Sequence, residues 1–408
     1  MDASSISKNY VEQLSTIGSL FVSSPLYISV FIMRFSFGLV VFSLPIYLPK
    51  REFSNLAVGV VAAAYPVAET IVGPIIGVLV DRLGRKQWIW MGLCLATIAL
   101  FAFTLSTSIP YLVLVHAVQG VAAAMIVVST LTLVTDVSTV STRGREMGIY
   151  DFANLGGYVL GIFTAGLLGF RFLLTPFHIG SILAAVGAVF AFFKVKDEKR
   201  RGARRALSPI QTVRMLVSDR RAAAMFPIWL AVSTFIGMAL TFGPRLGPSP
   251  LITSSVMAGI VLVLAFTQPF FGHLSDEYGR NRLMILGMLS LIGLFATVIV
   301  EFRSHLELTY LTPFFVVFGV GSFAFAPAAL ASLGDFAPER GRGTTMGVYS
   351  VVISLGTIIG PLLGGYLLDR YGLTSLFYAS LVILIAALGV TTLITSSGPT
   401  QTKHTAGA

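Results

Sequence analysis

The sequence predicts an all-α integral membrane protein with twelve transmembrane helices in two six-helix bundles. Composition is the first observation behind this prediction. Of the 408 residues, 55% are hydrophobic and 11% are charged, whereas a soluble domain carries about 25% charged residues. Too few polar groups remain to cover a water-facing surface, so the natural solvent of this chain is lipid. The long apolar runs and an internal repeat are the other two observations.

Apolar runs long enough to cross a bilayer, roughly 20 residues each, occur twelve times. They lie at about 27–48, 57–79, 87–106, 111–134, 147–169, 175–195, 223–243, 252–274, 283–301, 309–333, 346–367 and 374–395. Five segments follow: a tail at 1–26, a bundle at 27–195, a linker at 196–222, a second bundle at 223–395 and a tail at 396–408. The first tail has apolar residues at helical spacing from Ile6 to Phe21, which predicts an amphipathic helix. Ser208 and Pro209 predict a short helix in the linker.

The basic residues indicate which loops are cytoplasmic, because inner loops carry the excess of Lys and Arg. With both termini inside, 21 of the 28 Lys and Arg fall in inner segments. The exceptions are Arg34 within the first helix and six outer residues, Lys50, Arg51, Arg171, Arg245, Arg303 and Arg370. The net charge of +10 therefore indicates topology and contact with lipid headgroups rather than nucleic-acid binding. The single cysteine, Cys94, is read as a small core residue.

An internal repeat relates the two halves. Gly77, Asp81, Gly84 and Arg85 recur 195 residues later as Gly272, Asp276, Gly279 and Arg280, and Asp136 recurs 199 residues later as Asp335. The two halves are therefore parallel repeats of six helices each. Repeats related by an axis along the membrane normal are an established plan of transporters.

The segment GVLVDRLGRK at 77–86 resembles the loop 2–3 signature of the major facilitator superfamily of secondary transporters. The resemblance covers nearly the whole chain and implies an inner-face latch. Asp81 would face the N-terminus of the helix that begins near Met346, Gly77 would let the helices approach, Gly84 would form a tight turn, and Arg85 would pair with Asp136. The second half would repeat this latch with Gly272, Asp276, Gly279, Arg280 and Asp335.

Two other family motifs match in part. The segment HAVQGVAAA at 116–124 lies where proton-coupled exporters carry R-x-x-Q-G-x-x-A-A, with His116 at the Arg position. The exporter motif of helix 5, G-x-x-x-G-P-x-x-G-G, lacks its Pro in GYVLGIFTAG at 157–166 but is complete in helix 11, as GTIIGPLLGG at 356–365. Small residues in such runs also let any two membrane helices pack closely.

Four ionisable residues stand out inside the predicted spans, where charge is costly and therefore marks candidates for function. They are Arg34, Glu69, His116 and Asp151. By the rise of a helix, Arg34 lies roughly 10–12 Å and Glu69 roughly 18 Å from the inner boundary, so the Arg side chain can bridge the gap. Arg34 can pair with Glu69, with Asp151, or with both in turn. A carboxylate that exchanges an Arg partner for an apolar pocket carries a proton; a fixed ion pair that orients helices is the alternative.

The family resemblance implies that helices 1, 4, 7 and 10 line a central cavity, with contributions from 2, 5, 8 and 11. The polar and aromatic candidates on these helices are Phe37, Tyr65, Gln119, Asn154, Trp229, Thr234, Gln268, Tyr310, Phe314 and Phe318. An aromatic, lightly polar cavity suits an amphiphilic or hydrophobic organic molecule.

The resemblance therefore implies a monomeric carrier in the cytoplasmic membrane, most similar to the drug and metabolite efflux branches and working by alternating access. We expect proton-coupled antiport, with no bound cofactor or metal and no enzymatic activity. The alternatives are a proton symporter or uniporter for uptake, which the missing Pro of helix 5 favours, a lipid translocase, and a sensor on the same fold. A nucleotide-binding loop is absent from the sequence, so ATP is not expected to drive transport.

Overall fold

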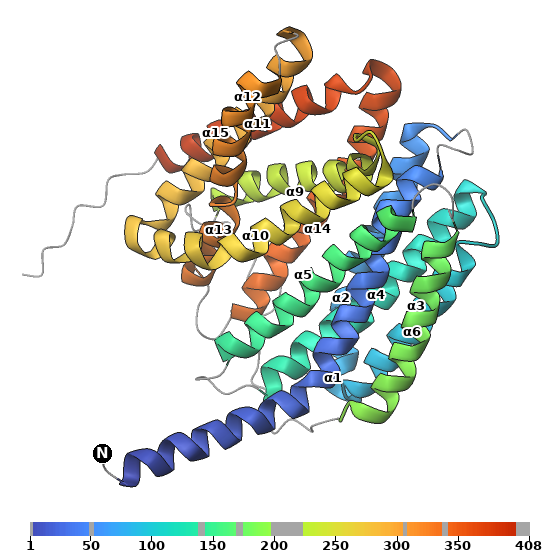
Figure 1. Ribbon diagram of the computed structural model, residues 1–408, viewed down its shortest axis with the longest axis vertical. Helices are drawn as coiled ribbons and strands as arrows, with labels where there is room; N and C mark the ends of the chain where they lie inside the picture. Colours follow the sequence, from blue (N-terminus) through green and yellow to red (C-terminus); the bar gives the residue numbers. More distant parts are fainter. Residues whose placement is uncertain are drawn as a thin grey trace, which may run out of the picture. The chain divides into compact units, whose positions relative to one another are not determined.

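The computed structural model describes residues 3–48, 53–137, 143–168, 174–196, 223–304, 308–336 and 342–396, and all regular elements in these ranges are helical (Figure 1). The first half contains α1 (Ala3–Tyr47), α2 (Asn55–Leu83), α3 (Lys86–Ala102), α4 (Ile109–Val137), α5 (Arg143–Leu168) and α6 (Thr175–Lys194). The second half contains α9 (Met225–Phe242), the 3₁₀ turn η3 (Gly243–Arg245), α10 (Pro250–Tyr278), α11 (Arg280–Ser304), α12 (Leu308–Ser322), α13 (Phe325–Phe336), α14 (Arg342–Tyr371) and α15 (Thr374–Ser396).

The predicted spans correspond to helices in the structure. In the described ranges, eleven helices are long and apolar enough to cross a membrane. The remaining predicted span, 87–106, corresponds to the shorter apolar helix α3, Lys86–Ala102. The all-helical membrane fold is therefore confirmed. The predicted linker helix at Ser208–Pro209 and most of the tail from residue 396 lie outside the described residues.

Two helix boundaries differ from the sequence-based prediction. α1 begins at Ala3, so the predicted tail helix and the first span are one helix of 45 residues. The span predicted at 309–333 is interrupted: α12 ends at Ser322 and α13 begins at Phe325. Pro327 explains the break, because proline has no N–H and its ring clashes with the carbonyl four residues earlier, at Phe323. The chain instead makes tight turns there, in which the amides of Phe323 and Ala324 donate to Val320 and Gly321.

The helices group into two compact units. The first unit contains Met1–Arg204, Ile236–Phe266 and Thr357–Arg370, and the second contains Arg205–Phe235, Thr267–Gly356 and Tyr371–Ala408. Parts of α9, α10 and α14 thus pack with the first six helices. The sequence-based division at 196–222 assigned these parts to the second bundle.

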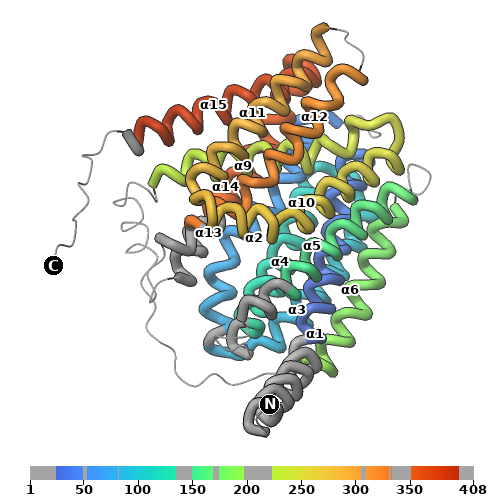
Figure 2. Tube along the Cα trace, turned by 60° about the vertical axis from the view of Figure 1, so that its left-hand side comes forward, coloured from blue at the N-terminus to red at the C-terminus, as the bar shows by residue number. Residues whose placement is uncertain are grey.

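In the first unit, α1 packs along α5 and α6, α2 packs along α4, and α3 packs along α4 and α6 (Figure 2). Its core is apolar, with fully buried Leu39, Phe42, Leu93 and Phe177 among its side chains. In the second unit, α11 packs against α12, α13 and α15. Its core is formed around Met288, Phe325 and Leu384.

Candidate functional site

Arg34 lies at the centre of the candidate site, on α1 within the first unit. Its Nε donates a hydrogen bond to Oδ1 of Asn154 on α5, at 2.5 Å. Its guanidinium carbon lies 5.9 Å from the centroid of the Phe37 ring, one turn along α1. A neutral amide and an aromatic face therefore hold the cation. The sequence placed Asn154 among the cavity residues but did not identify it as the partner of Arg34.

Two carboxylates lie near Arg34 without forming an ion pair with it. In the described part of the chain, neither Glu69 nor Asp151 has an oxygen within 4.0 Å of the guanidinium, although each is close enough to Arg34 to interact with its charge. Glu69 on α2 is half-buried, and Asp151 on α5 is exposed. The expected Arg34 pairing with Glu69 or Asp151 is therefore not formed in this structure.

His116 on α4 is fixed by a hydrogen bond to the backbone of α2. Its Nδ1 lies 2.9 Å from the carbonyl oxygen of Val61. A carbonyl only accepts, so Nδ1 carries the proton and, in the neutral ring, Nε2 is left as an acceptor. Nε2 is buried and has no partner in the structure. The ring is 4% exposed and lies between Tyr65 and Phe103, with both centroid distances 5.6 Å.

Aromatic rings connect these groups. Phe37 stacks on Tyr65 at a centroid distance of 4.4 Å and lies 5.7 Å from Tyr158. We call the residues Arg34, Phe37, Tyr65, Glu69, His116, Gln119, Asn154 and Tyr158 the polar cluster. Tyr158 was missed at the sequence level, although it lies one helical turn after Asn154 on the same face of α5.

Several polar atoms of the polar cluster are buried without a hydrogen-bond partner among the described residues. They are the hydroxyls of Tyr65 and Tyr158, Oε1 of Gln119 and Nε2 of His116. Leaving such an atom unsatisfied costs about 1–3 kcal/mol, and native proteins have few of them. Four on one group of helices mark a place suited to a polar guest, whether water, a proton or part of a substrate.

The predicted cavity residues of the second half do not form a comparable cluster of polar and aromatic side chains in the described part of the chain. Trp229 is 7% exposed and packs edge-to-face on Phe325, and the hydroxyl of Thr234 donates to the carbonyl of Leu230 in its own helix. Phe318 packs against Gly293 of α11. Trp229 and Phe318 therefore pack inside the second unit, and Nε1 of Trp229 is buried with no hydrogen-bond partner among the described residues. Gln268 is half-buried, and Tyr310 and Phe314 are exposed.

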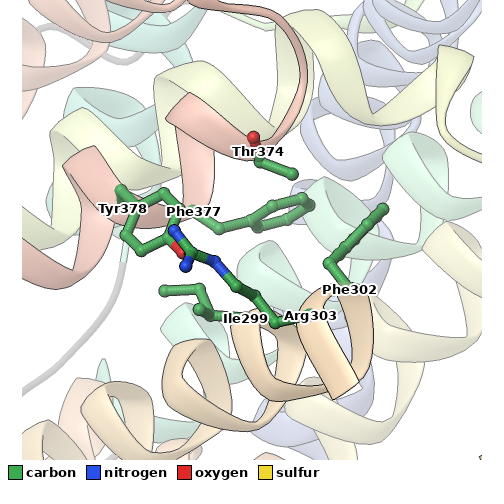
Figure 3. Close-up of a pocket in the computed structure, with 6 residues that line it drawn as sticks. All are labelled: Ile299, Phe302, Arg303, Thr374, Phe377 and Tyr378. Atoms are coloured by element: carbon green, nitrogen blue, oxygen red, sulfur yellow. The ribbon is translucent and has the colours of Figure 1, made fainter. Parts of the chain in front are cut away.

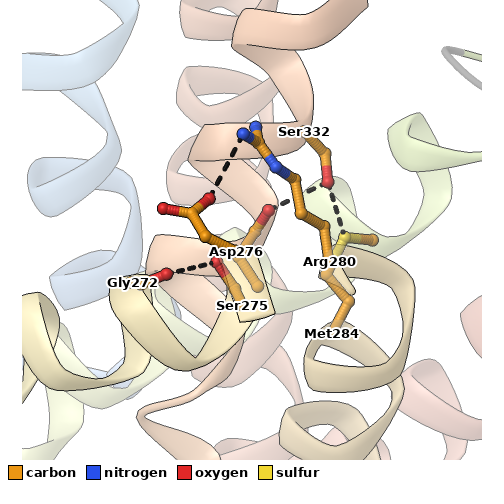
Figure 4. Close-up of polar contacts among 7 residues, drawn as sticks. Gly272, Ser275, Asp276, Arg280, Met284 and Ser332 are labelled. Atoms are coloured by element: carbon orange, nitrogen blue, oxygen red, sulfur yellow. Dashed lines mark hydrogen bonds and ion pairs between the residues drawn. The ribbon is translucent and has the colours of Figure 1, made fainter. Parts of the chain in front are cut away.

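The two latch turns have the backbone that the motif predicts. Gly84 has φ 94° and Gly279 has φ 95°, a region that residues with a Cβ rarely adopt. Arg85 is 4% exposed, whereas Arg280 is partly exposed and pairs with Asp276 one turn earlier, at 3.4 Å (Figure 4).

Other parts of the predicted latch depend on residues whose side chains the structure does not describe. A Cβ added at Gly77 would touch only Val128, at 4.0 Å, and one added at Gly272 would meet nothing within 4 Å among the described residues. The side chains at the start of the helix that the latch prediction places against α2, residues 342–350, lie outside the described residues, so the close helix approach at these glycines stays a prediction. The side chains of Asp81, Asp136 and Asp335 lie outside the described residues.

The opposite end of α2 carries a contact that the sequence did not predict. The Asp369 carboxylate on α14 accepts hydrogen bonds from the backbone amides of Asn55 and Leu56, at 2.9 and 2.8 Å, and from Nδ2 of Asn55, at 2.7 Å. The hydroxyl of Ser54 accepts from the amide of Ala57. Three of the free amides at the start of α2 are thus satisfied, and an anion lies at the positive end of the helix.

Small residues bring α2 and α14 together at this end. A Cβ at Gly59 would overlap the carbonyl oxygen of Pro361, and a Cβ at Gly365 would lie 2.8 Å from the Cα of Leu56. We call this contact the α2–α14 crossing, formed by Asn55, Leu56, Gly59, Pro361, Gly365 and Asp369. Nη1 of Arg245 also donates to Oδ1 of Asn55, at 2.5 Å.

The repeat places a second crossing between α5 and α10. Gly166 corresponds to Gly365 at the offset of 199 residues, and a Cβ there would overlap the side chain of Ser254 and lie 2.7 Å from the carbonyl of Pro250. We call this contact the α5–α10 crossing, formed by Gly166, Pro250 and Ser254. The hydroxyl of Ser249, 195 residues after Ser54, likewise accepts from the amide three positions on, at Ile252.

Two six-helix repeats, apolar spans and ionisable groups inside the first repeat together define a multi-pass membrane transporter. The chain matches the Major Facilitator Superfamily over residues 26–247 and again over residues 221–408, and it belongs to that family.

Relatives and solved structures agree with this assignment. The chain is 25% identical to Multidrug resistance protein 2 of Bacillus subtilis over 382 residues, covering 89% of this chain and 92% of the relative. It is 24% identical to the quinolone resistance protein NorA of Staphylococcus aureus over 353 residues, covering 84% and 89%. A bacterial homologue of the human lysosomal transporter Spinster, in an inward-facing and unoccupied conformation, superposes with a TM-score of 0.76 at 16% identity, covering 94% and 97%.

Proposed function

We propose that this protein is a proton-coupled exporter of amphiphilic or hydrophobic organic molecules. The observation that carries the proposal is the state of Arg34, which is bound by the neutral amide of Asn154 while Glu69 lies nearby without an ion pair. One cation thus has two competing partners on different helices. The relatives named for multidrug and quinolone resistance support export.

The competition gives a coupling mechanism. A charged Glu69 attracts the Arg34 guanidinium away from Asn154, and a proton on Glu69 removes that attraction. The bond between Arg34 and Asn154 is then the arrangement of the protonated state. Because α1, α2 and α5 each carry one of the three groups, the proton on Glu69 and the packing of these helices are thermodynamically linked.

The aromatic faces and unpartnered polar atoms of the polar cluster supply the substrate side of the site. Phe37, Tyr65 and Tyr158 offer ring surface to an apolar body, and Gln119 and His116 offer acceptors to its polar groups. We further propose that the protein works as a monomer in the cytoplasmic membrane with both termini inside. The proton gradient would drive transport, without a bound cofactor.

The test uses the full-length protein in proteoliposomes that contain a pH-sensitive dye and have an acidic lumen. Amphiphilic cations, neutral aromatics, sugars and organic acids are added outside, with protein-free liposomes as the control. Antiport predicts that an amphiphilic compound makes the lumen more alkaline, because its entry is exchanged for proton exit. Acidification would instead establish the second candidate, proton symport, which the missing Pro of helix 5 favours. Proton movement with none of the compounds would contradict coupled transport.

A further inference from the structure

A small pocket lies in the second unit, between the end of α11 and the start of α15 (Figure 3). Its lining residues are Ile299, Phe302, Arg303, Thr374, Phe377 and Tyr378. The cavity volume is about 140 Å³, whereas pockets for drug-sized molecules hold about 300–1,000 Å³. The pocket therefore suits a small chemical group rather than the transported molecule.

Arg303 supplies the charge of this pocket, and Tyr378 fixes its position. Nε of Arg303 donates to the Tyr378 hydroxyl at 2.9 Å, and the guanidinium lies 5.7 Å from the centroid of the Tyr378 ring. In the described ranges, no carboxylate oxygen lies within 4.0 Å of Arg303. Nε of Arg303 is thus bound by the protein, and the N–H groups of Nη1 and Nη2 can donate to a ligand.

The other lining residues form an apolar wall beside the Arg303 guanidinium. The rings of Phe302 and Phe377 stack at a centroid distance of 5.5 Å, which forms an apolar wall beside the cation. Thr374, the first residue of α15, also lines the pocket, with its hydroxyl pointing away from the Arg303 guanidinium (Figure 3). The site thus offers a fork of N–H donors beside an apolar surface within one small volume.

The depth of the pocket identifies the source of the ligand. The apolar span of α11 runs from Arg280 to Ser304, and the span of α15 begins at Thr374. Both Arg303 and Thr374 therefore lie at the ends of spans, at the level where lipid headgroups and interfacial aromatic side chains meet. A lipid places its phosphate at this depth and its chains beside the adjacent apolar wall.

We propose that this pocket binds the phosphate of a membrane lipid headgroup. The planar guanidinium matches phosphate oxygens in a bidentate manner, and Phe302 and Phe377 contact the glycerol and acyl carbons. The proposal does not depend on the direction or coupling of transport, because it uses no residue of the polar cluster.

The experiment is native mass spectrometry of the purified full-length protein titrated with phosphatidylglycerol. The variants are Arg303→Gln and the matched control Arg370→Gln, which removes another exposed arginine at the end of a span. We expect Arg303→Gln to weaken lipid retention about tenfold, as for loss of a charge-assisted contact, and Arg370→Gln to leave it unchanged. Equal retention by wild type and Arg303→Gln would overturn the proposal.

Two further measurements keep the test decisive if Arg303→Gln fails to fold. Tyr378→Phe keeps the charge but releases the guanidinium, and we expect it to weaken phosphatidylglycerol retention by a smaller factor. Wild-type protein should retain phosphatidylglycerol more strongly than diacylglycerol, which lacks the phosphate; equal retention would overturn the proposal. Displacement of the lipid by millimolar inorganic phosphate would assign the anion site to free phosphate, and failure to displace it would assign the site to the lipid headgroup.

Discussion

The α2–α14 crossing and the α5–α10 crossing are repeat-related, and they differ in one respect. Each places a glycine, Gly365 or Gly166, against the start of a helix that a serine caps. Only the α2–α14 crossing has a carboxylate on the helix start, because the residue that corresponds to Asp369 at the offset of 199 is Phe170. Small-residue packing is thus shared by the two repeats, and the charge is particular to one.

The two repeats differ in the same way inside the membrane. Arg34, Glu69 and His116 lie within spans of the first repeat. In the described spans of the second repeat, the charged residues lie near the ends, as Asp276, Arg280, Arg303 and Asp369 do. The fold therefore depends on small-residue packing that both repeats share. The proposed proton coupling depends on ionisable groups inside the membrane that only the first repeat carries.

The largest expected loss of stability comes from substituting glycines that occupy corresponding positions in the two repeats. Gly157 packs on Phe31 of α1, and the corresponding Gly356 packs on Ser233 of α9. Gly157→Leu and Gly356→Leu should each lower the free energy of unfolding by about 3 kcal/mol or more, because the added atoms overlap backbone or fixed side chains. Melting curves in detergent measure this. Gly389→Leu, with nothing within 4 Å, is the control, and similar melting of all three variants would contradict the shared role of the glycines.

The next effect tests the carboxylate that only one crossing has. Asp369→Ala should weaken the α2–α14 crossing by about 1–2 kcal/mol, since it removes three hydrogen bonds and the anion at the start of α2. We expect about tenfold faster labelling of Leu362→Cys by a membrane-impermeant maleimide, in a Cys94→Ala background that removes the single native cysteine. Arg370→Ala is the neighbouring control. An unchanged labelling rate would show that the small residues alone hold this crossing.

A smaller effect is expected when His116 is made apolar, as its repeat counterpart Phe315 is. His116→Phe should lower the free energy of unfolding by about 1 kcal/mol, because the hydrogen bond to the Val61 carbonyl is lost. His116→Asn should recover most of this loss, because its amide can donate to the same carbonyl. Equal melting temperatures for wild type and His116→Phe would show that the hydrogen bond adds nothing to stability.

The smallest effect on stability is expected at Tyr65. Its hydroxyl is buried without a partner, so Tyr65→Phe should change the free energy of unfolding by less than about 0.5 kcal/mol or raise it slightly. The same variant should raise the KM of transport for compounds that hydrogen-bond, if the hydroxyl serves the substrate. A marked loss of stability would mean that the hydroxyl has a structural partner.

Sequence reasoning worked best where a residue type answers a local backbone requirement. The family signature and its repeat implied tight turns at Gly84 and Gly279, and both glycines have a positive φ in the structure, which few other residues tolerate. The apolar runs gave the spans because bilayer thickness fixes their length. The break at Pro327 was not predicted, because the prediction used only the length of the apolar run. It did not consider that the ring of Pro327 clashes with the carbonyl four residues earlier in a continuous helix.

Partners far apart in the chain were harder to predict. Asp369 and Asn55 are 314 residues apart, and no local pattern in the sequence links them. Arg34 was expected to choose a carboxylate, yet it binds the amide of Asn154. Opposite charge correctly predicted that Glu69 and Asp151 lie near Arg34. The packing of α1, α2 and α5 determines that Asn154, and neither carboxylate, lies within hydrogen-bonding distance.

The most direct test of the proposed coupling is proton movement in proteoliposomes containing Glu69→Gln, with a transported compound identified in the wild type. The matched control is Glu277→Gln, which neutralises an exposed carboxylate on α10 in the second repeat. We predict that substrate-triggered proton movement falls to the level of protein-free liposomes in Glu69→Gln and stays at the wild-type level in Glu277→Gln. Wild-type proton movement in Glu69→Gln would contradict the assignment of coupling to the first repeat through Glu69.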